Sequence, residues 1–257
     1  MKNVVHVKNI NIGEGKPKVC VPITGATKKE ISEELDLLQT IKVDLVEWRG
    51  DLFQEIENEI SVKNMLQKIN QEIPHLPLLF TFRTKGEGGG REVTLEKYKE
   101  INRFVIESKL VDLVDVELFR GKNLVKELVS FAHLHDQKVI ISNHDFNQTP
   151  PRDEIIARLK LAADNGADIG KIAVMPRNDE DVLNLLSATS LVKELNHIPI
   201  VTMSMGADGL ISRLSGEVFG SAITFASGKT ASAPGQIEAE KLQTVLTIIH
   251  DSINKKK

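Results

Sequence analysis

Cysteine is almost absent from this sequence, which limits the covalent and metal chemistry open to it. Cys20 is the one cysteine among 257 residues, so the chain can form neither an internal disulfide nor a Cys-x-x-Cys metal site. HExxH and EF-hand patterns are missing too, and His133 and His135 are spaced to point apart on a helix. We therefore expect no metal, no cofactor and a reducing, cytoplasmic environment.

Long apolar runs and an excess of charge of one sign are also missing. No stretch approaches the ~20 apolar residues of a membrane span, and residues 1–13 alternate polar with apolar residues instead of forming a signal core. A net charge of −3 and a pI near 6.2 give no broad cationic field. We therefore expect no membrane and no nucleic-acid partner, and a small-molecule target.

From Lys18 onward, short apolar segments alternate with helical patterns, and eight such pairs predict a (β/α)8 TIM barrel. No linker is visible, so we expect one domain over residues 1–257. Residues 1–16 are predicted to form an N-terminal β-hairpin extension with Lys8 and Asn9 near its turn. Strands are predicted at 19–24, 43–48, 78–83, 111–118, 139–144, 169–175, 198–204 and 222–226. Helices are predicted at 28–38, 62–73, 95–108, 124–134, 155–165, 179–195 and 237–249, with a weak pattern at 207–214.

One residue does not fit its predicted strand. The segment 168–175 is rich in apolar residues, yet it contains Lys171. Desolvating an ammonium costs on the order of several kcal/mol, so this side chain has to meet a carboxylate, reach solvent or lose its proton. A neutral amine in a dry pocket is the nucleophile that Schiff-base chemistry requires. A snorkelling or ion-paired lysine is the alternative interpretation.

Polar residues gather at the predicted carboxyl ends of the strands, where barrel enzymes carry their active sites. His144 ends the strand that precedes the Lys171 strand, so a base is expected beside a nucleophile. The alternative is that these residues form buried charged layers that close the barrel interior. The others in the set are Glu47, Trp48, Arg49, Arg83, Asp115, Glu117, Ser142, Asn143 and Asp145.

Basic side chains at the same ends predict a cationic mouth and therefore an anionic substrate. Arginine binds a carboxylate through paired charge-assisted hydrogen bonds, and positive charges nearby help a lysine to lose its proton. The basic set is Arg49, Arg83, Lys171 and Arg213.

Two glycine-containing segments are predicted to be active-site loops. Segment 84–91 isolates Glu87 among glycines, and we expect it to bring this carboxylate towards His144. Segment 227–236 is predicted to close over a bound substrate. Ordinary loop flexibility is the alternative for both.

Seven sequence blocks resemble, in order, those of the type I 3-dehydroquinate dehydratases. They span nearly the whole chain, and seven blocks in register argue against a chance similarity. The blocks are Glu47-Trp-Arg49, Leu79-Phe-Thr-Phe-Arg83, Ile141-Ser-Asn-His-Asp-Phe146, Lys171-Ile-Ala, Thr202-Met-Ser-Met205, Ile211-Ser-Arg-Leu214 and Ala231-Ser-Ala-Pro-Gly-Gln236.

The resemblance implies dehydration of 3-dehydroquinate to 3-dehydroshikimate in the shikimate pathway, and it implies a homodimer. Lys171 would form the Schiff base, His144 would transfer protons and Glu87 would be the carboxylate partner of the histidine. Arg213 would hold the substrate carboxylate. The family's substrate contacts correspond to Glu47, Arg49, Arg83, Arg213, Ser232 and Gln236. One departure is Pro22, which stands where well-known members offer a serine.

Two other functions also fit the residues. A lysine-dependent aldolase or other lyase would use the same imine chemistry on the same fold, and a retro-aldol reaction predicts cleavage of a carbon–carbon bond. A barrel that has lost catalysis and only binds a carboxylate ligand is the second, although the intact Lys171 and His144 argue against it.

Overall fold

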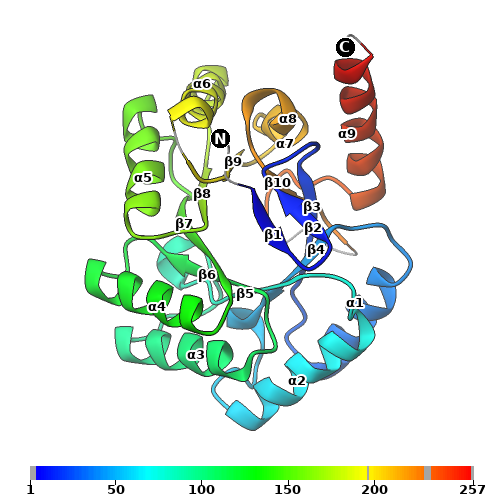
Figure 1. Cartoon of the computed structure of the whole chain (residues 1–257), viewed down its shortest axis with the longest axis vertical. Coiled ribbons are helices and arrows are strands. Elements are labelled where there is room, and N and C mark those ends of the chain that lie inside the picture. The colour runs from blue at the N-terminus through cyan, green and yellow to red at the C-terminus, as the bar shows by residue number, and fades with distance from the viewer. Residues whose placement is uncertain (1–3, 196, 229–232, 256–257) are drawn as a thin grey trace.

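A closed barrel of parallel strands surrounded by helices forms the body of the molecule (Figure 1). The computed structural model describes residues 4–195, 197–228 and 233–255. Eight strands are ordered β10-β3-β4-β5-β6-β7-β8-β9, and the Ala222 N–H donates to the Ile200 carbonyl at 2.7 Å to close the sheet. The predicted barrel is confirmed. The strands are β3 (Lys18–Ile23), β4 (Leu45–Arg49), β5 (Leu78–Thr81), β6 (Leu113–Glu117), β7 (Lys138–Asp145), β8 (Ile169–Val174), β9 (Ile200–Ser204) and β10 (Ile223–Phe225).

The helices follow the strands in the predicted order. They are α1 (Lys28–Leu38), α2 (Glu59–Glu72), α3 (Leu95–Ser108), α4 (Lys122–Leu134), α5 (Arg152–Asp164), α6 (Asp179–Leu195), α7 (Leu210–Leu214), α8 (Gly216–Phe219) and α9 (Ala239–Asn254), with short 3-10 turns η1 (Gly50–Leu52) and η2 (Lys85–Glu87). Polar caps fix several starts: the Thr27 hydroxyl accepts from the Glu30 N–H, and Asn58 and Thr94 cap α2 and α3 in the same way. In the described ranges no helix is long and apolar enough to cross a membrane.

The largest difference from the predicted elements is at the seventh helix. The expected helix at 207–214 is replaced by two short helices, α7 and α8, that meet at Ser215. Gly209 lies against the preceding strand, because a Cβ there would be 2.2 Å from the Ser204 carbonyl oxygen. Helix α7 therefore starts only after this close approach. The last helix also differs, since it begins at Ala239 instead of residue 237 and continues to Asn254.

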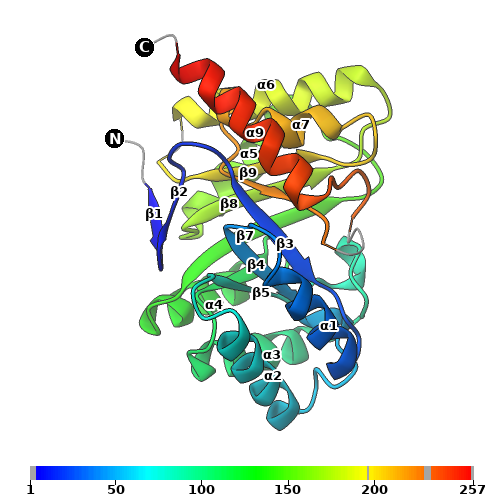
Figure 2. The ribbon, with the colours of Figure 1, turned by 90° about the vertical axis from the view of Figure 1, so that its right-hand side faces the viewer.

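The N-terminal hairpin covers the amino-terminal end of the barrel, on the left in Figure 2. It consists of β1 (Val5–Val7) and β2 (Ile10–Ile12), which pair antiparallel, and Lys8 adopts a positive φ of 46° at the turn. Its inward side chains pack against apolar residues at the starts of the barrel strands, which closes this end. The residues in that cluster include Val5, Val7, Ile12, Cys20, Leu45, Leu79, Leu113, Ile140 and Ile169.

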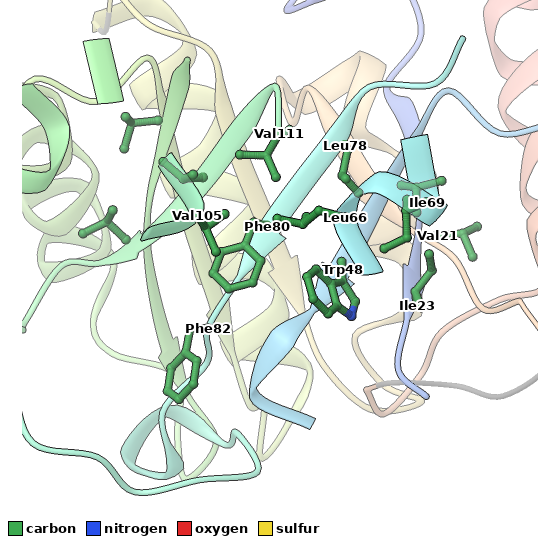
Figure 3. Packing of buried hydrophobic residues seen from close by; sticks show 14 of the residues in the cluster. Val21, Ile23, Trp48, Leu66, Ile69, Leu78, Phe80, Phe82, Val105 and Val111 are labelled. Atoms are coloured by element: carbon green, nitrogen blue, oxygen red, sulfur yellow. The ribbon is translucent and has the colours of Figure 1, made fainter. Parts of the chain in front are cut away.

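Side chains along each strand alternate between the barrel interior and the layer under the helices. In the outer layer, Trp48 and Phe80 make an edge contact with ring centroids 5.6 Å apart, and Leu66 and Ile69 of α2 belong to the same cluster (Figure 3). The interior is apolar in its amino-terminal half. Polar interior side chains are thus collected at the carboxyl ends of the strands.

Candidate active site

A cavity of about 90 Å³ opens at the carboxyl ends of the strands, and it brings together most of the predicted site residues. A larger cavity of about 360 Å³ lies at the amino-terminal end, but Lys171 and His144 are not among its lining residues. Seven of the nine predicted residues line the smaller cavity: Glu47, Arg49, Arg83, Glu87, His144, Lys171 and Gln236.

Lys171 points into this cavity from β8 and is 6% exposed. Its Nζ atom lies 3.6 Å from Oδ2 of Asp115 and 4.4 Å from the centroid of the Phe225 ring. The ion-paired arrangement weighed as the alternative from the sequence is therefore present. An imine can form only after this ammonium gives up a proton, so a base has to be nearby.

His144 is the next-to-last residue of β7, the strand beside β8, and its imidazole is a candidate for that base. Its backbone N–H donates to Oε2 of Glu87 at 2.9 Å, and Nδ1 lies 3.0 Å from the same oxygen. Because a carboxylate oxygen accepts both contacts, we assign the proton to Nδ1, which leaves Nε2 as the proton acceptor. Burial, followed by the nearby charges of Arg83 and Lys171, holds the pKa of His144 well below its ordinary value. The imidazole is therefore neutral at pH 7.

Glu87 lies in η2, at the position where the sequence predicts a carboxylate for the histidine. Burial raises its pKa to about 7, although the charge of Arg83 opposes the shift. The turn ends at Gly88, whose φ of 82° favours glycine. Both the N–H and the hydroxyl of Thr84 donate to Glu117 at 2.8 Å, which ties the start of the loop to β6.

Arg49 and Arg83 are held by carboxylates, so the expectation of a cationic mouth is wrong. The Arg49 guanidinium donates twice to Asp51, at 2.8 and 2.9 Å. Arg83 lies 2.8 Å from Asp115 and 3.1 Å from Glu117. Burial alone would lower the pKa of Arg83, but these carboxylates raise it above its ordinary value. The positive charges of the mouth are largely matched by negative ones.

Arg213 is the exception. It lies on α7, is 1% exposed and donates to the Pro234 carbonyl at 2.9 Å, but in the part of the chain that the structure describes no carboxylate comes within 4 Å. Its Nε atom is buried without a hydrogen-bond partner among the described residues. Burial lowers the pKa of Arg213 to about 10, so the side chain remains a cation at pH 7. A buried cation of this kind favours a bound anion.

Of the other predicted substrate contacts, Glu47 lies within the described residues and Ser232 does not. Glu47 is buried and accepts a hydrogen bond from the Thr81 hydroxyl at 2.7 Å. Ser232, and with it the centre of the predicted closing segment, lies outside the described residues. Pro22 is buried next to Glu47 in the strand register and offers no hydroxyl, so the departure from the family pattern stands.

Three residues of the site received no role from the sequence. No role is predicted for Asp51 from the sequence, although it follows Arg49 by two residues just after a strand, a spacing that allows a local ion pair. Asp115 and Glu117 were placed on their strand but not assigned to a partner. Their common parity in the strand predicts a shared interior face. Their partners, Arg83 just after β5 and Lys171 on β8, come close only when the barrel forms.

Known proteins resemble the chain over nearly its full length. The family model of type I 3-dehydroquinase matches residues 19–253. The chain belongs to the type I 3-dehydroquinase family. A 3-dehydroquinate dehydratase of Clostridium botulinum is 52% identical over 254 residues, covering 98% of this chain and 100% of the relative. One from Clostridioides difficile is 51% identical over 255 residues, covering 99% and 100%.

Solved structures of the type I 3-dehydroquinase family agree with this assignment. The type I 3-dehydroquinate dehydratase of Clostridium difficile with covalently modified comenic acid has a TM-score of 0.95 at 50% identity and covers 98% of this chain and 100% of its own. The family and the enzyme class implied by the sequence blocks are confirmed. More distant barrels share the fold alone, such as a 3-keto-L-gulonate-6-phosphate decarboxylase from Vibrio cholerae at 13% identity and a TM-score of 0.58.

Proposed function

We propose that the protein dehydrates 3-dehydroquinate to 3-dehydroshikimate, a step of the shikimate pathway, through a Schiff base on Lys171. The observation that carries the proposal is that one cavity holds a buried lysine and a neutral imidazole, while the buried Arg213 contacts Met203 and Phe225 in the lining of the same cavity. These groups suit a substrate that carries both a ketone and a carboxylate. The relatives named above are 3-dehydroquinate dehydratases, and one of them carries a covalently modified ligand.

In the proposed reaction, Arg213 binds the substrate carboxylate and the ketone meets Nζ of Lys171. Nε2 of His144 takes a proton from the Lys171 ammonium, and the neutral amine adds to the carbonyl carbon. The proton on His144 then passes to the hydroxyl group of the adduct, which leaves as water and gives an iminium ion. The iminium draws electrons from the neighbouring carbon, so Nε2 of His144 can remove a proton there. The resulting enamine expels the β-hydroxyl group, which takes a proton from His144 and leaves as water. Hydrolysis of the iminium then releases the product and restores the lysine.

Glu87 would act on this sequence through the imidazole. Its carboxylate accepts the Nδ1 hydrogen, which keeps Nε2 turned away and available as a base. When His144 holds the transferred proton, the same carboxylate stabilises the imidazolium. We assign contacts with the substrate hydroxyls to Glu47, Arg49, Arg83, Ser232 and Gln236.

Ultraviolet absorbance of purified protein mixed with 3-dehydroquinate tests the proposal, because the product enone absorbs and the substrate does not. We expect absorbance to rise with the wild-type protein and with Lys85→Ala, an exposed lysine in η2, but not with Lys171→Ala. Products of carbon–carbon cleavage, identified by mass spectrometry, would favour the aldolase alternative. Binding without any product would favour a barrel that only holds its ligand.

We also infer that the protein works as a homodimer in the cytoplasm. Leu183, Leu191 and Leu195 of α6 are 63%, 41% and 62% exposed, which leaves an apolar strip available for self-association. Sedimentation velocity should give the mass of two chains, and a monomer at micromolar concentration would contradict the inference.

A further inference from the structure

Asp115 lies between the two cations in the centre of the barrel. It is fully buried on β6, with Oδ1 2.8 Å from Nη2 of Arg83 and Oδ2 3.6 Å from Nζ of Lys171. The Ser142 hydroxyl donates to Oδ1 at 2.5 Å, so that oxygen is fixed from two sides. Oδ2 faces Lys171 and has no hydrogen-bond partner among the described residues.

The two cations depend on Asp115 to different degrees. Arg83 also lies 3.1 Å from Glu117 and 3.6 Å from Glu87, so it has other counter-charges. For Lys171, by contrast, Asp115 is the single carboxylate within 4 Å in the described part of the chain. The charge at the lysine nitrogen is therefore balanced by one residue.

The other carboxylates in and around the cavity have hydrogen-bond or ion-pair partners other than Lys171. Glu87 binds the ring of His144, and Glu47 accepts from the Thr81 hydroxyl. Glu117 accepts from Thr84 and pairs with Arg120 at 2.6 Å.

We propose that Asp115 is a positioning residue that serves as the counter-ion of the protonated imine on Lys171, an inference that rests on the proposed Schiff-base function. Covalent attachment leaves the nitrogen tied to the same strand, so the iminium charge forms beside Oδ2. Its positive charge is needed to draw electrons from the neighbouring carbon, and an unbalanced cation in the barrel interior would be costly. Asp115 keeps that nitrogen protonated, so that it is a cation in the iminium before proton removal and again after the loss of water.

The pH dependence of trapping with cyanoborohydride tests this role. Cyanoborohydride reduces the iminium far faster than the neutral imine, so the trapped fraction falls at the pH where the imine nitrogen loses its proton. That nitrogen faces Asp115 on β6, and the charged or titratable groups around it include His144, Arg83 and Cys20. In Asp115→Asn with substrate, we expect this upper pH limit to fall by about 1 to 3 units, the usual effect of an opposite charge at this range. We expect kcat to fall more than KM rises, because Arg213 is untouched.

Glu117→Gln is the matched control, since it removes a carboxylate from Arg83 without touching Lys171. It should leave the upper pH limit in place. Ser142→Ala removes the hydrogen bond to Oδ1 of Asp115 and should lower the upper pH limit of trapping by a smaller amount. If circular dichroism shows that Asp115→Asn does not fold, Ser142→Ala is used in its place. An unchanged limit in the folded variant, or an equal fall in Glu117→Gln, would overturn the role of Asp115. If wild-type protein forms no adduct on Lys171 at any pH, the proposed function itself fails.

Discussion

His144 is neutral in this site because of its surroundings and not because of its type. Burial and neighbouring positive charges hold its pKa well below the ordinary value, so it is ready to accept a proton at neutral pH. We expect His144→Ala to bind substrate and to turn it over roughly 10²- to 10⁴-fold more slowly, the usual contribution of a positioned base. Steady-state kinetics and binding calorimetry measure the two effects separately. Turnover near the wild-type rate would exclude the histidine as the base.

Glu87 should set the pH dependence of the reaction near neutrality. Burial raises its pKa to about 7, so it becomes a carboxylate, and a better partner for an imidazolium, as the pH rises through that value. Activity should therefore rise with pH through about 7 in the wild-type protein. In Glu87→Gln this step should disappear while substrate binding remains, because the amide oxygen still accepts from Nδ1 but does not titrate. A variant with the same pH profile as the wild type would contradict this assignment.

Arg213 should matter more to substrate binding than to stability. A charge-assisted hydrogen bond is worth about 1.5–3 kcal/mol, so Arg213→Gln should raise KM roughly 10- to 100-fold. Its melting temperature should not fall, because the substitution removes a buried cation that has no carboxylate near it among the described residues. Arg177→Gln, which removes a positive charge from the exposed segment before α6, is the control and should leave KM unchanged. Equal effects of the two substitutions would point to net charge and away from a specific carboxylate site.

Among the elements, the loop after β5 has to keep one shape to place its carboxylate. A Cβ at Gly89 would lie 1.9 Å from the Arg83 carbonyl oxygen, so Gly89→Ala forces the loop away from the strand end. We expect kcat to fall by roughly 10-fold or more, because small displacements of catalytic groups are costly. Gly86→Ala in the same loop is the control, since its Cβ would meet Arg120 only at an ordinary 3.6 Å. Similar kinetics for the two variants would show that the loop does not position Glu87.

The sequence predicts most elements because local signals are enough to define them. The strand expected at 169–175 is observed as Ile169–Val174, and the hairpin turn lies at Lys8 as expected. The seventh helix could not be predicted in the same way. Its late start, at Leu210, depends on the close approach of Gly209 to Ser204, which is a tertiary contact.

For the whole molecule, we infer that the barrel and its hairpin form a single domain, since the apolar residues of the hairpin and of the strand starts belong to one cluster. Barrel closure also decides which charges meet. The pair of Arg49 and Asp51 is local, but Asp115 on β6 meets Arg83 from the loop after β5 and Lys171 from β8. The sequence pattern therefore predicts which residues gather around the cavity but not how their charges are balanced.

The central claim is a covalent imine on Lys171, and trapping with borohydride in the presence of 3-dehydroquinate tests it most directly. Reduction converts the iminium to a stable secondary amine, which adds the mass of the reduced substrate to the chain. Peptide mass spectrometry should locate that mass on a peptide containing Lys171, with no adduct in Lys171→Ala. An adduct on Lys85 or Lys229, or no adduct while product still forms, would contradict the account.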